Sequence, residues 1–376
     1  MEITSQIAKV LNINSNQINE VLKLFSEEAT IPFIARYRKE RTGGLDEDQL
    51  REIETLNNYL TLLAERKETV LKSIEEQGKL TDELKEKILA ADKLQEVEDL
   101  YLPYKPKRKT RGTIAKAKGL EPLANFIISN PNFKGDFESI LKEYINKEKE
   151  VLTIDDALNG AKDIIAEMIS DNAEVRKIVR ESFQTDSNIC STKTNKKAEE
   201  NSKKTDVYEI YHDFQIEITR IKPYQILAIN RGEREGFLKA SFQFEKESLL
   251  GRIYNEHFNV KKTFFEEILR ETVSDSFGRL IQPSIEREVR SYLTEIADDH
   301  AVTIFASNLK QLLLQPPMFN KIIMGIDPGY VSGSKVAVID KTGKYLEGQT
   351  IYPHPPQNKK EDAKKIIIKF IEKYKV

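Results

Sequence analysis

The spacing of hydrophobic residues changes near Lys321, and this change constrains the fold more than any other feature of the 376-residue chain. Upstream, apolar residues recur every three to four positions over most of the chain, which is the period of an amphipathic helix. Downstream, short β-like runs joined by glycine-containing turns lie at 322–326, 335–340 and 344–351, and a helical pattern over 361–374 follows. The sequence therefore predicts a mainly α chain whose last part is a three-stranded meander with one helix.

This change also predicts the domain organisation. We expect a multi-helical region over residues 1–317 and a separate, smaller α/β segment over 318–376. Charged residues make up 32% of the chain, which favours an elongated helical region with much solvated surface. Residues 185–206 include no aromatic residue and almost nothing to bury, so we predict a flexible loop there. The run 237–244 is the one clear strand expected before the last segment.

Local signals set several helix boundaries. Two short helical patterns lie within residues 3–25 across a polar break, which gives a helix-turn-helix-like unit, although most such pairs are plain αα-hairpins. Asp46, with Gln49 three residues later, forms a variant of the capping box before a long amphipathic helix. A second long helix is expected to begin after an N-cap at Ser284 and to end near Leu314, before a proline pair.

The charge and cysteine content limit the classes of function. The 59 Lys and Arg residues nearly balance the 61 Asp and Glu residues, so nucleic-acid binding requires local basic patches. The single cysteine, Cys190, excludes an internal disulfide and fits a reducing compartment. The four histidines are scattered and give no zinc-binding spacing. Because no apolar run has signal-peptide or membrane-span length, we expect a cytoplasmic protein without a membrane partner. We also expect no metal and no cofactor.

Two local clusters of basic residues are the candidate nucleic-acid-binding sites. The first, "IARYRKER", precedes a glycine pair, and the second, "PYKPKRKTRGTIAKAK", has seven Lys or Arg residues and no acidic residue. Phosphate binding needs such a local excess, since each neutralised phosphate releases a counterion. The candidate residues are Arg36, Arg38, Lys39, Lys105, Lys107, Arg108, Lys109 and Arg111. The alternative is neutralisation by acidic neighbours, which for the first cluster would be Glu27, Glu28, Asp46 and Glu47.

Asp327, in "GIDPG", ends the first strand of the meander, where several metal-dependent nucleases place an active-site carboxylate. Two-metal chemistry needs several carboxylates around ions about 4 Å apart, and one Asp cannot hold them. The following "GYVSGSK" has the wrong spacing for a phosphate loop and leads into a strand instead of a helix. We therefore favour a turn-capping role for Asp327 and assign no catalytic residue and no metal ligand.

Several longer runs resemble the bacterial Tex family of transcription accessory proteins. They are "TIPFIARYRKERTGGLDEDQLR", "LYLPYKPKRKTRGTIAKAKGLEPLA", "LAINRGEREGFL", "PSIEREVRSYLTEIAD" and "MGIDPGYVSGSKVAVID". The resemblance implies a mostly helical N-terminal region with a helix-turn-helix-like unit, followed by a YqgF-type RNase H-like domain. Three strands and one helix would be only an incomplete part of that domain, so we expect a truncated form. In the family, helix-hairpin-helix modules and a C-terminal OB-fold RNA-binding domain come next.

The resemblance implies an RNA- or nucleic-acid-binding transcription accessory protein, of which this chain would be an N-terminal scaffold. We expect it to bind RNA in preference to DNA, weakly without the OB-fold domain, and to contact the transcription machinery. We expect no enzymatic activity. Two alternatives stay open: a metal-dependent RNase H-like nuclease, and a protein-interaction scaffold without nucleic-acid affinity.

Overall fold

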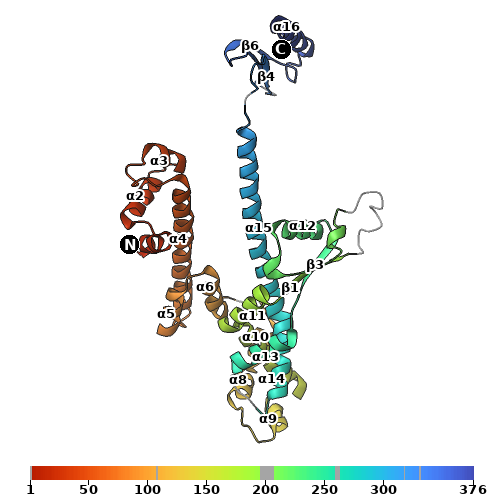
Figure 1. Ribbon diagram of the computed structural model, residues 1–376. Helices are drawn as coiled ribbons and strands as arrows, with labels where there is room; N and C mark the ends of the chain where they lie inside the picture. The colour runs from red at the N-terminus through yellow and green to blue at the C-terminus, as the bar shows by residue number, and fades with distance from the viewer. Residues whose placement is uncertain (1, 107–108, 195–206, 259–262, 317, 330–331) are drawn as a thin grey trace. The chain divides into compact units, whose positions relative to one another are not determined.

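A computed structural model describes residues 2–106, 109–194, 207–258, 263–316, 318–329 and 332–376. The chain divides into two compact units, Met1–Asp299 and His300–Val376, and each is described by itself. The boundary expected at 317/318 stays a prediction. The fold class is confirmed as mainly α with a small α/β segment (Figure 1). In the described part of the chain, no helix has both the length and the apolar character that crossing a bilayer requires.

Helix α4 is the axis around which the first helices pack (Figure 1). The elements are α1 (Glu2–Leu11), α2 (Ser15–Ser26), α3 (Ile31–Tyr37), α4 (Glu47–Glu76), α5 (Asp82–Ala90) and α6 (Leu94–Tyr101). The first half of α4 presents Leu50 and Ile53 to α1, α2 and α3, whereas Val70 and Ile74 in its second half pack with α5 and α6. The predicted capping box is present, because the Asp46 side chain accepts a hydrogen bond from the Gln49 backbone.

The largest core of the first unit surrounds α10, whose buried residues face several directions. It is built from α7 (Arg111–Ala117), α8 (Glu121–Ser129), α9 (Phe137–Glu143), α10 (Ile154–Asp171), α11 (Ala173–Thr185), α13 (Lys246–Phe258), α14 (Glu266–Ser276) and α15 (Gln282–Leu313). Ala157 and Ala161 let neighbouring helices approach closely, while Ile164, Ile165 and Ile169 fill the space between them.

The predicted loop at 185–206 is wrong in its first part. Residues Asn188–Lys193 form β1, the central strand of an antiparallel sheet between β2 (Asp213–Glu217) and β3 (Leu238–Gln243). Its sequence, NICSTK, is mostly polar, but Ile189 is buried opposite Phe242 of β3, and two partner strands satisfy its backbone. Residues 195–206 lie outside the described residues. Helix α12 (Pro223–Arg234) connects β2 to β3.

The predicted N-cap at Ser284 is also wrong. Helix α14 continues through a π-helical turn, Phe277–Ile281, directly into α15, so Ser284 lies inside helical structure. Its hydroxyl accepts a hydrogen bond from Arg176. The π-helical turn accounts for the tolerance of Pro283, because it changes the backbone pairing just before a residue that has no N–H. The end of α15 at Leu313 agrees with the prediction.

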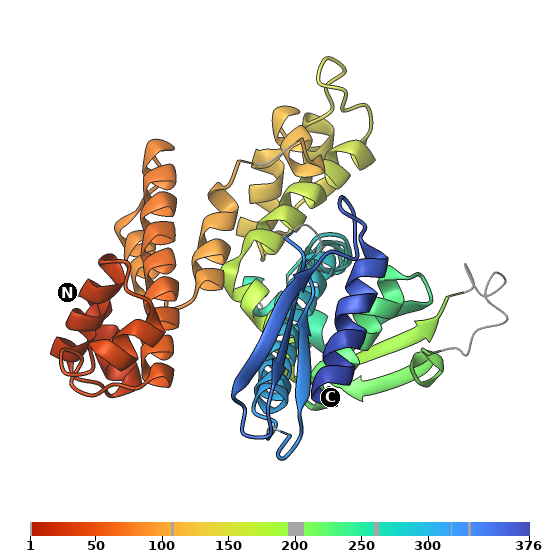
Figure 2. The ribbon, with the colours of Figure 1, turned by 90° about the horizontal axis from the view of Figure 1, so that it is seen from above.

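The second unit holds the predicted meander and helix. Strands β4 (Ile323–Asp327), β5 (Ser334–Ile339) and β6 (Tyr345–Ile351) pair antiparallel in the order β4-β5-β6. Helix α16 (Lys360–Tyr374) lies beside the sheet (Figure 2). Ala363 and Phe370 of this helix pack with Val336, Val338 and Ile351 of the strands, so the sheet has one buried face.

Candidate nucleic-acid interface

The first predicted cluster lies at the end of α3. Ile31 and Ile34 are buried in the first core and fix the inner face of this short helix. Arg36 is in its last turn, Arg38 is the residue that ends it, and Lys39 follows. All three basic side chains are exposed. The structure therefore brings Arg36, Arg38 and Lys39 to one exposed turn.

This turn is held in place from inside the protein. The Gln17 side chain on α2 donates hydrogen bonds to the carbonyls of Thr42 (2.9 Å) and Gly43 (3.2 Å). Thr42 is fully buried, and its hydroxyl donates to the carbonyl of Lys39 at 3.1 Å. Gly43 and Gly44 have φ values of 66° and 89°, which favour glycine, so the turn closes without strain. The basic side chains thus project from a fixed backbone.

Within the described part of the chain, acidic neighbours neutralise one residue of this cluster. Arg41 pairs with Glu20 at 3.0 Å and with Glu27 at 3.7 Å. Among the described residues, no carboxylate lies within 4.0 Å of a charged nitrogen of Arg36, Arg38 or Lys39. The neutralisation that the sequence left open therefore occurs at Arg41 and leaves the three predicted binding residues available.

The second cluster divides in the same way. Its last two lysines pair with acidic residues, Lys116 with Glu121 at 2.8 Å and Lys118 with Glu150 at 3.7 Å. The candidate residues that precede them in the described part of the chain are exposed and make no such pair: Lys105, Lys109 and Arg111. Lys107 and Arg108 lie outside the described residues.

A carboxylate of the protein itself occupies the N-terminus of α7, which directly follows these basic residues. The backbone N–H of Gly112 donates to the Glu167 carboxylate at 3.0 Å, and Glu167 is buried. The charge of Arg111 also acts on the nearby Asp163. Burial raises the pKa of the Asp163 carboxyl, and the positive charges of Arg279 and Arg111 partly offset that rise. Any phosphate bound here must therefore be held by side chains, since the helix terminus already has its anion.

Asp327 stands where the sequence predicts, at the end of β4. It is exposed and lies opposite Lys335 of β5 in the strand register. In the described residues, no three His, Cys, Asp or Glu side chains come together in a group that could hold a metal ion. The Pro328–Gly329 turn is held by a hydrogen bond of 3.4 Å from the Gly329 backbone to the Ser334 hydroxyl.

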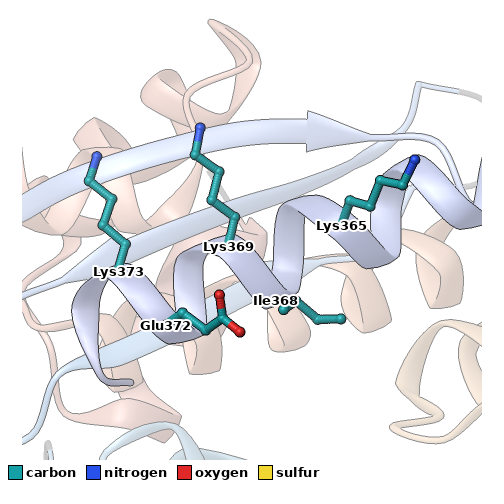
Figure 3. A pocket seen from close by; sticks show the side chains of 5 residues that line it. All are labelled: Lys365, Ile368, Lys369, Glu372 and Lys373. Carbon is teal, nitrogen blue, oxygen red and sulfur yellow. The ribbon is translucent and has the colours of Figure 1, made fainter.

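A third basic surface on α16 was missed from the sequence. Lys365, Lys369 and Lys373 project from one side of the helix and, with Ile368 and Glu372, line a shallow hollow of about 520 Å³ (Figure 3). Their spacing of four residues, which places side chains on one helical face, was the signal. Acidic residues interrupt the basic run, with Glu372 between two of the lysines and Glu361 and Asp362 just before them, so the sequence shows no basic stretch free of acids here. Lys373 is paired with Glu347 at 2.6 Å. Residues 300–376 contain twelve lysines and six acidic residues, although the whole chain has a net charge of −2.

Comparison with known proteins gives three consecutive family matches. They are the Tex-like protein N-terminal domain at residues 1–75, the Tex central region at 133–305 and the Tex protein YqgF-like domain at 321–376. A Bacillus subtilis protein named YdcI is 45% identical over all of this chain and 52% of its own length. The transcriptional accessory protein Tex of Neisseria gonorrhoeae is 38% identical over 95% of this chain and 47% of its own.

A human relative is named S1 RNA-binding domain-containing protein 1. It is 30% identical over 96% of this chain and 37% of its own length. The chain thus spans about half the length of these two bacterial relatives, and less of the human one. The three matched regions follow the same order as the helical region, the large α10 core and the small α/β unit.

Proposed function

This chain belongs to the Tex family, and we propose that it is a transcription accessory protein that binds nucleic acid, RNA in preference to DNA. The names of its relatives support the proposal, one as a transcriptional accessory protein and one as a protein with an S1 RNA-binding domain. Binding by this chain itself would use basic surfaces on a helical frame, and it would be weak and strongly dependent on salt.

One observation carries the proposal. Arg36, Arg38 and Lys39 stand exposed on a backbone turn that Gln17 and Thr42 hold in place, without a carboxylate partner among the described residues. Arg41 in the same cluster, by contrast, is paired with Glu20 and Glu27. Because the backbone of the turn is already held, phosphate binding has to order only the side chains of these cations.

The test compares two alanine variants with a control that removes neutralised cations. One variant replaces Arg36, Arg38 and Lys39, and the other replaces Lys105, Lys109 and Arg111. Each removes three cations that have no carboxylate partner among the described residues. The control Lys116→Ala with Lys118→Ala removes two cations that Glu121 and Glu150 already neutralise. Fluorescence anisotropy with a single-stranded RNA of about twelve nucleotides, at about 50 mM salt, should show weaker binding for both triple variants and little change for the control. Equal affinities for the wild type and all three variants would refute the assignment of these surfaces.

We further propose that the chain is not a nuclease. Asp327 is the position that a metal-dependent RNase H-like enzyme would use first, and it is exposed, with Lys335 opposite in the strand register. Incubation of the protein with labelled RNA, DNA or a branched junction, with Mg²⁺ or Mn²⁺, should leave each substrate intact. Cleavage that disappears in Asp327→Asn would establish the nuclease instead.

A protein-interaction scaffold is the second candidate function. The second half of α15 favours it, because apolar side chains there are exposed: Val302, Phe305, Leu309, Leu312 and Leu313. The discriminating experiment is capture of RNA polymerase by the immobilised chain before and after RNase treatment. Capture that survives RNase, combined with no measurable RNA affinity, would favour the scaffold over the proposal above.

A further inference from the structure

Two aromatic rings stand on the outward face of α3, next to the cations that have no carboxylate partner among the described residues. Phe33 and Tyr37 are one helical turn apart, and their side chains are 39% and 61% exposed. The ring centroids are 5.5 Å apart with the planes tilted by 46°. The inner face of the same helix is already occupied by buried Ile31 and Ile34, so the rings add nothing to that core.

A planar cation completes this group. The guanidinium of Arg38 lies 5.0 Å from the centre of the Phe33 ring, and its Nη1 donates to the carbonyl of Tyr37 at 3.0 Å. These contacts orient Arg38 and Phe33 with respect to each other. Tyr37 is left as the more exposed of the two rings.

The chemical combination points to one kind of ligand. Exposed rings beside cations without acidic partners match a chain of alternating flat bases and phosphates, because bases stack on aromatic side chains while phosphates bind the cations. A paired duplex hides the faces of its bases, so only a single strand can use both parts of the surface. An apolar protein segment would use the rings and leave Arg36 and Lys39 without a role.

We propose that Tyr37, with Phe33 and Arg38 beside it, is a stacking site for an unpaired base of single-stranded nucleic acid. Arg36 and Lys39 then bind the flanking phosphates. This inference rests on the proposed function and adds what the basic residues alone do not specify, the strandedness of the ligand. Stacking of this kind tolerates any base, since every base has an aromatic face.

The experiment compares Tyr37→Ala with Tyr37→Phe on two probes of similar charge. An oligouridylate of about twelve nucleotides offers bases and phosphates, whereas inorganic polyphosphate of similar length offers phosphates alone. Tyr37→Ala should weaken oligouridylate binding about tenfold and leave polyphosphate binding unchanged. Its salt dependence should equal that of the wild type, because no cation is lost. Tyr37→Phe keeps the ring and should bind both probes like the wild type.

The outcomes separate this inference from the proposed function. If the triple variant of Arg36, Arg38 and Lys39 loses RNA affinity but Tyr37→Ala does not, the stacking site is wrong and the phosphate surface stands. If neither variant changes binding, the stacking site and the phosphate surface on α3 are both wrong, and the proposed function then depends on the variant of Lys105, Lys109 and Arg111. A cross-linking measurement on the unmodified protein needs no variant: RNA substituted with 5-iodouridine should attach on irradiation to a peptide that includes Tyr37. Attachment only elsewhere would overturn the inference.

Discussion

The buried group of charges around Asp99 gives a sharp test of how the helices are joined. Asp99 on α6 accepts hydrogen bonds from Arg176 at 2.9 Å and from Arg180 at 2.6 Å, both on α11. Glu288 on α15 faces the same two guanidinium groups. The Asp99 and Arg176 side chains are only 5% and 8% exposed. Three helices distant in sequence therefore meet in one group of four charges.

Replacing Asp99 by Ala leaves one buried and one largely buried guanidinium group with a single carboxylate. Truncating one partner of a buried ion pair costs about 3–5 kcal/mol, because the remaining charge keeps its desolvation penalty and loses its compensation. This is a large part of the about 5–15 kcal/mol by which a folded domain is usually stable. Denaturant unfolding followed by circular dichroism should show the loss, and hydrogen exchange should show the earliest opening in α6 and α11.

Two further variants show how much of the loss in stability comes from the charge of Asp99 and from its burial. Asp99→Asn keeps an acceptor oxygen but removes the charge, so its loss should fall between those of the wild type and Asp99→Ala. Arg51→Ala breaks an exposed pair with Glu47 and should cost about 0.5 kcal/mol or less. If Asp99→Ala unfolds at the same denaturant concentration as Arg51→Ala, the group of charges does not join these helices as described.

Three more predictions concern a helix glycine, a buried histidine and the small sheet. Gly112→Ala should lower the free energy of unfolding by about 1–3 kcal/mol, because the new methyl would lie 2.5 Å from the Glu167 carboxyl carbon. In the same denaturation assay, the control Gly251→Ala, in open space within α13, should be neutral or stabilising. Burial lowers the pKa of His257, so the unfolded state binds the proton more readily. The free energy of unfolding should therefore be highest above a pH of about 6.5 and decrease at lower pH. His257→Gln should remove this decrease in unfolding curves taken between about pH 7.5 and 5.5. Backbone amides of residues 320–376 should exchange with deuterium faster than those of α10, because β4 and β6 are outer strands; equal protection would contradict this.

Much of the helical region could be predicted because its signals are local. The Asp46 capping box and the spacing of Leu50 and Ile53 act within a few residues, and the structure has the same boundaries. The meander was predictable for the same reason, since its alternating apolar residues and short turns lie within about thirty residues of sequence.

Strand β1 and the interior position of Ser284 were not predictable from local sequence. The polar residues of β1 become a central strand only because Phe242 and Ile216 arrive from distant segments and pair beside Ile189. Ser284 has the type and position of an N-cap, but the π-helical turn upstream continues the helix past it. In both places tertiary structure overrides the local preference.

The composition of the sequence located the basic clusters, but it did not show which of their cations are paired with acidic residues. The sequence could not decide which cations are neutralised, because that depends on pairs formed between elements. Arg41 pairs at 3.7 Å with Glu27, which the sequence named as a possible partner, and more closely with Glu20 of α2, which it did not. The aromatic pair on α3 lies within the run "TIPFIARYRKER", yet its exposure is a property of the fold, since Ile31 and Ile34 determine which face is buried.

The measurement that tests the central claim most directly is the salt dependence of RNA binding. Each phosphate bound on a single strand contributes about −0.7 to the slope of log affinity against log salt. If the six described candidate cations supply the contacts, the full chain should show a slope of about −2 to −4 between about 50 and 200 mM salt. The variant without Arg36, Arg38 and Lys39 should have a shallower slope by up to about 2. A slope near zero, or the same slope in both proteins, would contradict the account.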